Sequence, residues 1–430
     1  MRSVADPSWE GHGHDGPVGV SLPRVWEPRA KEVMEEAPKL GIPINLDVNS
    51  GNLIGLGMSP VSSQNGSRTT SASATLSTSP ENLKVWTDAP VKKVLFEGTR
   101  AVGVELLDGR KAFAKHEVIL SAGSVDTPKL LLLSGIGPPS TLSTHNIPLI
   151  SALPGVGQNL HDHPGIFLSA LMKSGTSIGN RMAFSRDTIA AQKAEQQWNT
   201  DQTGEWDTQF QTLPVMFNKV PRIYESEEFL ALPEQEREFL LRDQVPTYEA
   251  TIGGPLPVPP EEVPEGYEFQ TLVVFGMNTQ STGSVTLASA DPNDKPVLDL
   301  GTYTDASGFD IKVMVEGVKD VVGFFEKTQM YKNGFVKWLE APETFGEEEV
   351  VEGWLREKSI TVWHACGTVK MGRKGEEGTC VDSEFRVLGV EGLRVVDMSV
   401  APVLISGHTQ ATAYLIGATA AEKLIEEYGL

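Results

Sequence analysis

Two histidines near the end of the sequence have neighbours typical of catalytic loops. His364 precedes Gly367 and Thr368, whereas His408 directly follows Gly407. A strand-like run at 393–397, which ends at Asp397, separates the two. An unperturbed imidazole titrates near pH ~6.5, so a pair of imidazoles in one cleft can accept and return protons at neutral pH. A single histidine is more often structural, but this spacing predicts that both rings reach one site.

The elements that must position these rings follow from the pattern of apolar residues. Strands are expected at 83–87, 91–96, 101–106 and 117–123, followed by a helix at 127–133 with Pro128 in its first turn. Acidic helices are expected at 186–197 and 225–242, a proline-rich loop at 255–264, and strands at 269–277 and 284–287. Helices at 309–327 and 409–428 complete the pattern, which predicts a mixed α/β fold.

Composition excludes several classes of protein. The 430 residues carry 57 acidic and 36 basic side chains, and a net charge of −21 repels nucleic acid. No apolar run approaches the ~20 residues that a membrane span needs, and no signal peptide is evident, so we expect a soluble, cytoplasmic or otherwise intracellular protein. Two cysteines, Cys366 and Cys380, form no disulfide framework, and a catalytic thiol beside His364 is the less favoured interpretation of Cys366.

Two histidine-containing loops suggest metal or nucleotide binding only weakly. Residues 11–16 fit G-x-G-x-x-G, but no strand precedes them and 17–22 read as a strand, whereas a phosphate site needs a strand before and a helix after. His12, His14 and Asp15 in this loop have no further ligand cluster nearby. His161, Asp162 and His163 could bind a metal, but a hydrogen-bonded loop is the favoured interpretation. We expect no metal site.

Several longer motifs make the sequence resemble a known enzyme family. In order, they are EVILSAG (117–123), DTPKLLLLSGIG (126–137), HNIP (145–148), LPGVGQNLHDH (153–163), GLRVVDMS (392–399) and GHTQ (407–410). Together with the His364 segment they resemble the glucose-methanol-choline oxidoreductase family. Several long motifs in one order are more specific than any single motif.

The resemblance implies a flavoenzyme that moves a hydride from an alcohol carbon to the flavin N5 of FAD. His364 would be the general base that takes the hydroxyl proton, and His408 the second imidazole, which orients the alcohol. The implied flavin contacts are Asp397, His408, Thr409 and Gln410, and the implied adenine-side contacts are Val91, Ser121, Ala122 and Gly123. The expected partner is a small-molecule alcohol, with no nucleic acid and no membrane.

The sequence departs from the family at its start. Family members begin with a strand, a glycine-rich turn, a helix and an acidic residue, none of which is found here. We therefore expect an N-terminally truncated member with an incomplete Rossmann-like FAD-binding domain at 51–165 and 361–430, the latter carrying the catalytic histidines. A substrate-binding domain with an antiparallel sheet and helices would fill 1–50 and 166–360. FAD is the expected cofactor, with an incomplete site.

Three interpretations of this departure remain open. In the first, the chain is a fragment or one half of a split FAD-dependent alcohol dehydrogenase or oxidase, completed by an N-terminal half or a homo-oligomer. In the second, it has lost the flavin and uses His364 and His408 for isomerase or cyclase chemistry. In the third, it is a non-catalytic partner of a full-length relative. Retained paired imidazoles favour some chemistry.

Overall fold

The computed structural model describes residues 12–22, 26, 29–77, 80–178, 188–204, 206, 213–253 and 263–430. The chain divides into two compact units. Unit 1 comprises Met1–Lys84, Gly165–Met277 and Ile311–Ile360, and unit 2 comprises Val85–Pro164, Asn278–Asp310 and Thr361–Leu430. Because each unit is assembled from three separate stretches, a site within one unit can combine residues that are distant in sequence.

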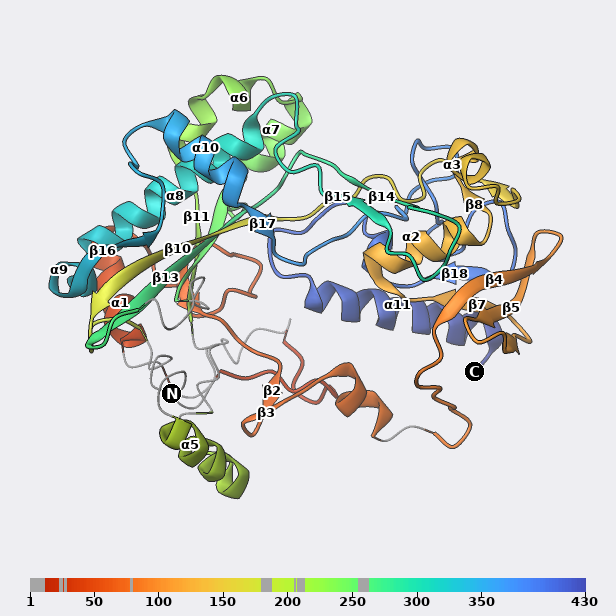
Figure 1. Cartoon of the computed structure of the whole chain (residues 1–430), viewed down its shortest axis with the longest axis horizontal. Coiled ribbons are helices and arrows are strands. Elements are labelled where there is room, and N and C mark those ends of the chain that lie inside the picture. The colour runs from red at the N-terminus through yellow and green to blue at the C-terminus, as the bar shows by residue number, and fades with distance from the viewer. Residues whose placement is uncertain are drawn as a thin grey trace. The chain divides into compact units, whose positions relative to one another are not determined.

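Unit 1 is built on an antiparallel sheet (Figure 1). Its strands run in the order β1-β11-β12-β13-β10-β16, with β17 paired to β10. They are β1 (Gly55–Met58), β10 (Pro164–Lys173), β11 (Pro214–Asn218), β12 (Tyr248–Ile252), β13 (Tyr267–Gly276), β16 (Phe335–Glu340) and β17 (Ile360–Thr361). The smaller pair β2 (Ser63–Gln64) and β3 (Ser67–Arg68) is also antiparallel.

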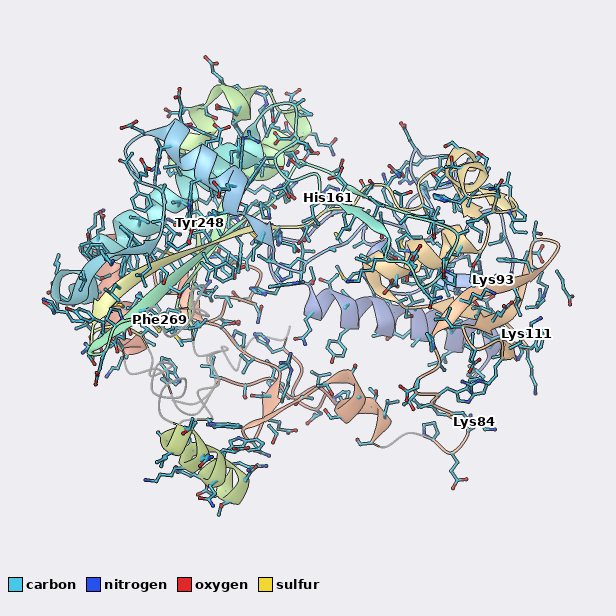
Figure 2. The ribbon with its side chains drawn as sticks, in the orientation of Figure 1. Lys84, Lys93, Lys111, His161, Tyr248 and Phe269 are labelled. Atoms are coloured by element: carbon cyan, nitrogen blue, oxygen red, sulfur yellow. The ribbon has the colours of Figure 1, made fainter. Side chains whose placement is uncertain are left out.

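Helices accompany this sheet. They are α1 (Ala30–Glu36), α5 (Thr188–Asp201), α6 (Glu227–Leu230), α7 (Glu234–Leu240), α8 (Phe309–Lys327), α9 (Gln329–Gly334) and α10 (Glu348–Lys358), with shorter turns at Ala37–Leu40, Ala72–Leu76 and Pro221–Glu225. Tyr248, labelled in Figure 2, fixes α8 to the sheet because its hydroxyl donates to the Asp320 carboxylate at 2.6 Å. Asn218 donates to the same carboxylate oxygen at 2.8 Å. Strands β11 and β12 are thereby both tied to α8.

Unit 2 is organised around the parallel pair β7 (Val118–Leu120) and β18 (Leu393–Val395). Its other elements are β4 (Val91–Glu97), β5 (Arg100–Leu106), β6 (Lys111–Phe113), α2 (Gly123–Leu133), β8 (Ile136–Gly137), α3 (Pro139–Thr144), β9 (Ser151–Ala152), β14 (Ser284–Thr286), β15 (Val297–Asp299), a turn at Met398–Val400, and α11 (Gln410–Tyr428). β4, β5 and β6 form an antiparallel sheet, and β8 pairs with β9 in parallel. The core of the unit includes Leu120, Leu131, Leu132 and Val395.

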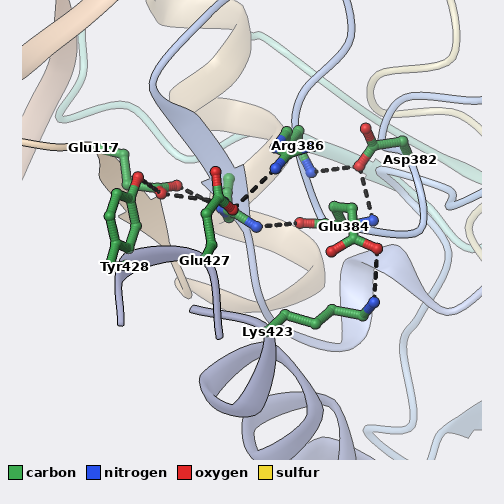
Figure 3. A network of polar contacts seen from close by, with 8 residues as sticks. Glu117, Asp382, Glu384, Arg386, Lys423, Glu427 and Tyr428 are labelled. Carbon is green, nitrogen blue, oxygen red and sulfur yellow. Dashed lines mark hydrogen bonds and ion pairs between the residues drawn. The ribbon is translucent and has the colours of Figure 1, made fainter. Parts of the chain in front are cut away.

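A buried arginine, Arg394, ties the two parallel strands of unit 2 to the end of α11, and Figure 3 labels its partners Glu117, Glu384 and Glu427. Arg394 is 2% exposed, and its Nε donates to Glu117 Oε2 at 2.5 Å. Its other nitrogens donate to the Glu384 carbonyl at 2.7 Å and to the Glu427 carboxylate. Glu117 precedes β7 and Glu427 lies in the last turn of α11, so one guanidinium group joins three segments.

Helix α2 begins earlier than the sequence pattern predicts. We expected it at 127–133 with Pro128 in the first turn, but it starts at Gly123, so Pro128 lies inside it. A proline inside a helix leaves the carbonyl four residues before it without its N–H partner. That carbonyl belongs to Ser124, and it accepts instead from the Thr368 hydroxyl at 2.7 Å. A residue from the His364 motif thus compensates for the proline.

Most other expected elements are present, and the mixed α/β fold is confirmed. The helix expected at 309–327 forms as α8 within those bounds. The strand expected at 83–87 does not form, because Leu83, Val85 and Trp86 are 47%, 59% and 54% exposed and no strand among the described residues pairs with them. The helix expected at 225–242 breaks into α6 and α7, with Pro233 between them. The loop at 255–264 lies mostly outside the described residues.

The borders of the two units fall near some of the expected domain boundaries. Changes of unit occur at 164/165 and 360/361, close to the boundaries expected at 165/166 and 360/361. Residues 51–84 belong to unit 1 and 278–310 to unit 2, which differs from the expected division. The functional names of these domains stay a prediction. Within the described residues, no helix is both long and apolar enough to cross a membrane.

Candidate active site

A short antiparallel contact in unit 2 brings two histidine segments together. The backbone of His161, labelled in Figure 2, exchanges both hydrogen bonds with Cys366, at 3.0 and 2.9 Å. Moving two residues along each segment, in opposite directions, leads from this pair to His163 and His364. Because side chains alternate along extended backbone, residues two apart share one side. The contact therefore explains how imidazoles 201 residues apart meet.

His163 and His364 face each other through the same type of ring nitrogen. The two Nδ1 atoms are 3.0 Å apart, and the rings meet edge to face at 87°. Both rings are buried, since His163 is 0% and His364 7% exposed. The sequence pattern favoured a structural loop for His163 and gave no sign that this ring contacts His364.

The loop that carries His364 is held by Asp162. Asp162 Oδ1 accepts the His364 backbone N–H at 3.0 Å, and Oδ2 accepts the Thr361 hydroxyl. The Thr361 oxygen in turn accepts the N–H of Trp363 at 2.9 Å. Trp363 has a φ of 62°, an uncommon conformation for a bulky residue. The hydrogen bonds on both sides of Trp363 hold the backbone turn that directs His364 inward.

His408 is the third histidine of this cluster, which comprises His163, His364 and His408. It lies two residues before α11, and its ring centroid is 4.7 Å from that of His364, with an angle of 78° between the planes. Unlike His364, His408 is exposed. The structure therefore brings together the two histidines that the sequence analysis selected. Their catalytic roles stay a prediction.

Burial and neighbouring charges lower the pKa of three histidines in this region, His161, His163 and His364. Burial, followed by the charge on His408, lowers the pKa of His364 from its usual 6.5 to about 4. Burial, followed by charges on His364 and His408, holds the pKa of His163 well below its usual value. Burial, followed by the charge on Lys370, also lowers the pKa of His161. All three rings are therefore neutral at pH 7, the state in which an imidazole can accept a proton.

Cys366 does not have the properties of a nucleophile. It is buried, and burial, followed by the charge on Asp162, raises the pKa of its thiol to about 12. Burial likewise raises the pKa of Cys380 to about 12. Because the thiolate is the reactive form, neither cysteine is activated. Among the described residues, no three His, Cys, Asp or Glu side chains are arranged to hold a metal ion.

Most of the residues expected near FAD lie at the starts of two helices in unit 2, α2 and α11. Ser121 and Ala122 are exposed where β7 ends, and Gly123 opens α2. The carboxyl end of a parallel strand is where open α/β sheets bind ligands. Thr409 precedes α11 without capping it through its side chain, so the first N–H groups of α11 suit a polar group of a cofactor. Val91 opens β4.

Asp397, also expected to lie along the flavin, uses its carboxylate within the chain. Oδ2 accepts from the Gly123 N–H at 3.0 Å and from the Thr127 hydroxyl at 2.6 Å. Oδ1 accepts from the Ser399 N–H at 2.8 Å. Asp397 therefore joins the end of β18 to the start of α2. Its flavin contact stays a prediction.

These residues fit FAD in part. The exposed ends of β7 and α11 offer backbone donors for the flavin and adenine sides. The segment 11–16 supplies no phosphate turn, because no strand or helix is described from His12 to Val20, and Gly11 lies outside the described residues. The strand expected at 17–22 reduces to one bridge between Ser21 and Val61.

Comparison with known proteins identifies the family. Two family models, both described as GMC oxidoreductase, match residues 2–165 and 279–417. An alcohol dehydrogenase [acceptor] of Pseudomonas putida is 32% identical over 97% of the chain, and the match covers 72% of that relative. Human mitochondrial choline dehydrogenase is 31% identical over 95% of the chain, which corresponds to 65% of its own length. The chain therefore belongs to the GMC oxidoreductase family, whose members are FAD-dependent.

Solved structures agree with this family. An FAD-dependent oxidoreductase from Chaetomium thermophilum superposes on 98% of the chain with a TM-score of 0.82 and 25% identity, over 76% of its own length. A formate oxidase from Aspergillus oryzae gives a TM-score of 0.85 over 99% of the chain and 75% of its own length, at 24% identity. Because the N-terminal family model matches from residue 2, the match does not support the expected truncation.

Proposed function

We propose that this chain carries the proton-transfer residues of an FAD-dependent oxidoreductase that acts on a CH–OH group. The observation that carries the proposal is the buried, neutral His364 with its ring 4.7 Å from the exposed His408. The relatives support it, because they include alcohol and choline dehydrogenases. They do not favour the flavin-less isomerase or cyclase that the sequence left open.

The chemistry divides between the cofactor and the chain. FAD, when bound, accepts a hydride from the alcohol carbon. His364 accepts the hydroxyl proton at Nε2, because its Nδ1 faces His163 at 3.0 Å. His408 orients the alcohol by a hydrogen bond to its oxygen. Loss of one proton and one hydride converts the alcohol to the carbonyl product, and a neutral imidazole suits the first of these steps.

Specific residues of unit 2 would hold the cofactor. Ser121, Ala122, Gly123 and Val91 line the adenine side in this proposal, and Thr409 and Gln410 at the start of α11 contact the flavin side. Asp397 contributes by fixing the Gly123 N–H at 3.0 Å. Exposed backbone at a strand end and at a helix start supports this assignment, since both bind polar ligand groups.

The first test is turnover of the FAD-loaded chain with a panel of primary alcohols and an artificial electron acceptor. His364→Ala should abolish turnover. His145→Gln is the matched control and should leave turnover unchanged. His145 lies at the end of α3, outside the cluster. Full activity of His364→Ala in a sample with bound FAD would refute the assignment of the base.

A complementing dinucleotide-binding segment is the second part of the proposal. Helix α11 exposes Leu415, Ile425 and other apolar side chains, with Leu415 66% and Ile425 51% exposed, and of its residues Ala420 is buried. In the described part of the chain β7 pairs with β18 alone, and Ile119 of β7 is 43% exposed. Apolar surface of this kind marks a contact surface. A strand, glycine-rich turn and helix packed here would supply the phosphate site.

Flavin titration and light scattering test this part. The chain alone should bind FAD weakly and gain affinity when mixed with a separate dinucleotide-binding segment. Tight FAD binding by a monodisperse monomer would refute the need for a complement. A stable dimer that binds FAD would instead assign the apolar surface to a second copy of the chain.

A further inference from the structure

The contact between His163 and His364 restricts where protons can lie on the two rings. A neutral imidazole carries one N–H and one acceptor nitrogen. At 3.0 Å the two Nδ1 atoms are within hydrogen-bond distance, so one must donate and the other accept. The two rings therefore have opposite tautomers, and each choice has a different chemical consequence for His364.

One of the two tautomer arrangements allows His364 to act as a base, and the other prevents it. If His163 donated, Nδ1 of His364 would be the acceptor and its only proton would lie on Nε2. That nitrogen could then not take a proton from an alcohol. If His364 donates through Nδ1, its Nε2 keeps a free lone pair, which is the state that a general base requires.

The role proposed for His364 selects the second choice, because only this tautomer leaves its Nε2 able to accept a proton. The ring of His163 is 0% exposed, so solvent does not compete with His364 for its Nδ1. Nε2 of His163 forms no hydrogen bond with any described residue, so the contact with His364 is the side-chain hydrogen bond through which this ring is held.

We propose that His163 is a positioning residue that accepts the Nδ1–H of His364 and thereby keeps Nε2 of His364 unprotonated for the alcohol proton. The inference rests on the proposed function of His364. When His364 takes the proton it becomes an imidazolium ion with an N–H at both nitrogens. The bond to His163 then becomes charge-assisted and stronger, and no proton needs to pass to His163.

Nitrogen NMR of the ring atoms tests the tautomers without any turnover. The chain is labelled with 15N-histidine, and the two-bond ring couplings identify which nitrogen of each histidine carries the proton. Variants His163→Asn and His364→Gln assign the two sets of signals by their loss. We expect His364 protonated at Nδ1 and His163 at Nε2 at pH 7. A proton on Nε2 of His364, or exchange between both tautomers, would overturn the proposal even if His364 proved to be the base.

A pair of substitutions separates positioning from packing. His163→Asn keeps a side-chain oxygen that can occupy the place of Nδ1, whereas His163→Leu fills space without an acceptor. We expect kcat to fall about 10- to 100-fold in His163→Leu, as for other residues that orient a functional histidine, with KM little changed. His163→Asn should recover most of this loss. Equal kcat values for the two variants, at matched thermal stability, would contradict the proposal.

Discussion

The carboxylate of Asp162 accepts the backbone N–H of His364, with 3.0 Å between Oδ1 and N, across 202 residues of sequence. The same side chain accepts the Thr361 hydroxyl, so it fixes both ends of the turn at Trp363. Burial raises the pKa of Asp162, and the hydrogen bonds from Thr361 and His364 oppose this effect. The position of the proposed base therefore depends on a carboxylate that binds the backbone of His364 and not its ring.

Removal of this carboxylate should affect both stability and rate. Asp162→Ala leaves the buried N–H of His364 and the Thr361 hydroxyl without their acceptor, and each lost partner costs about 1–3 kcal/mol. We expect a lower melting temperature and slower flavin reduction in single-turnover experiments. Asp291→Ala, in an exposed turn, is the control and should change neither quantity. Unaltered rate and stability in Asp162→Ala would argue against its anchoring role.

The rate of alcohol oxidation should depend on pH through His364. Its pKa is lowered to about 4, so the ring is neutral, and able to accept a proton, at higher pH. The rate of flavin reduction should stay constant down to about pH 5 and fall as the pH passes through about 4. In His408→Gln the charge on His408, which helps to lower the pKa of His364, is removed. The fall in rate should therefore begin at a higher pH. A fall that begins near the ordinary histidine value and does not respond to His408→Gln would disagree with this prediction.

Histidine burial should also make stability depend on pH. The folded pKa of His364, about 4, lies below the ordinary 6.5, so the unfolded chain binds more protons between these values. The contribution of this group is therefore complete above about pH 6.5 and is lost as the pH falls towards 4. Denaturant titrations of wild type and His364→Gln at pH 7 and pH 5 measure it. The variant should lose less stability than wild type on acidification.

Arg394 should be a major determinant of stability. Arg394→Met leaves Glu117, which is 7% exposed, as a buried carboxylate without its cation. Breaking a buried ion pair in this way costs about 3–5 kcal/mol of the free energy of unfolding. Arg386→Met, whose side chain is 47% exposed, is the control and should cost less than about 1 kcal/mol. Urea unfolding of both variants measures the difference, and similar losses would show that burial of the charge is not decisive.

Two glycine substitutions should have opposite signs. Gly367 has a φ of 87°, and a Cβ there would lie 2.5 Å from the Asn159 carbonyl oxygen, so Gly367→Ala should destabilise the chain and displace His364. Gly353 lies in α10 with open space around its Cα, so Gly353→Ala should stabilise by about 0.5–1 kcal/mol. Melting temperatures of both variants test this. Tolerance of alanine at residue 367 would contradict the close approach.

The sequence predicted the local elements better than the contacts between them. Helix 309–327 follows from its apolar periodicity. Residues 83–87 are strand-like, but no strand in the described part of the chain pairs with them. The break between α6 and α7 could have been expected from Pro233, since a proline restricts the residue before it. The start of α2 could not, because the Thr368 hydroxyl that satisfies the Ser124 carbonyl comes from 244 residues away.

The same limit applies to the candidate site. His364 and His408 stood out because Gly367 and Thr368 follow the first, Gly407 precedes the second, and a strand-like run that ends at Asp397 separates them. Nothing in the local pattern of residues 161–163 indicates His364 as a partner. That pairing arises only from the backbone contact between His161 and Cys366, a tertiary contact that local periodicity does not encode.

Helix α2 is hydrogen-bonded to the His364 segment in two places. Thr368 donates to the Ser124 carbonyl, and the Ser124 hydroxyl donates to the Ala365 carbonyl, each at 2.7 Å. This helix starts just after the end of β7, where the proposal places the cofactor. In this proposal, His364 as proton acceptor and the bound cofactor as hydride acceptor would both be held by helix α2 of unit 2.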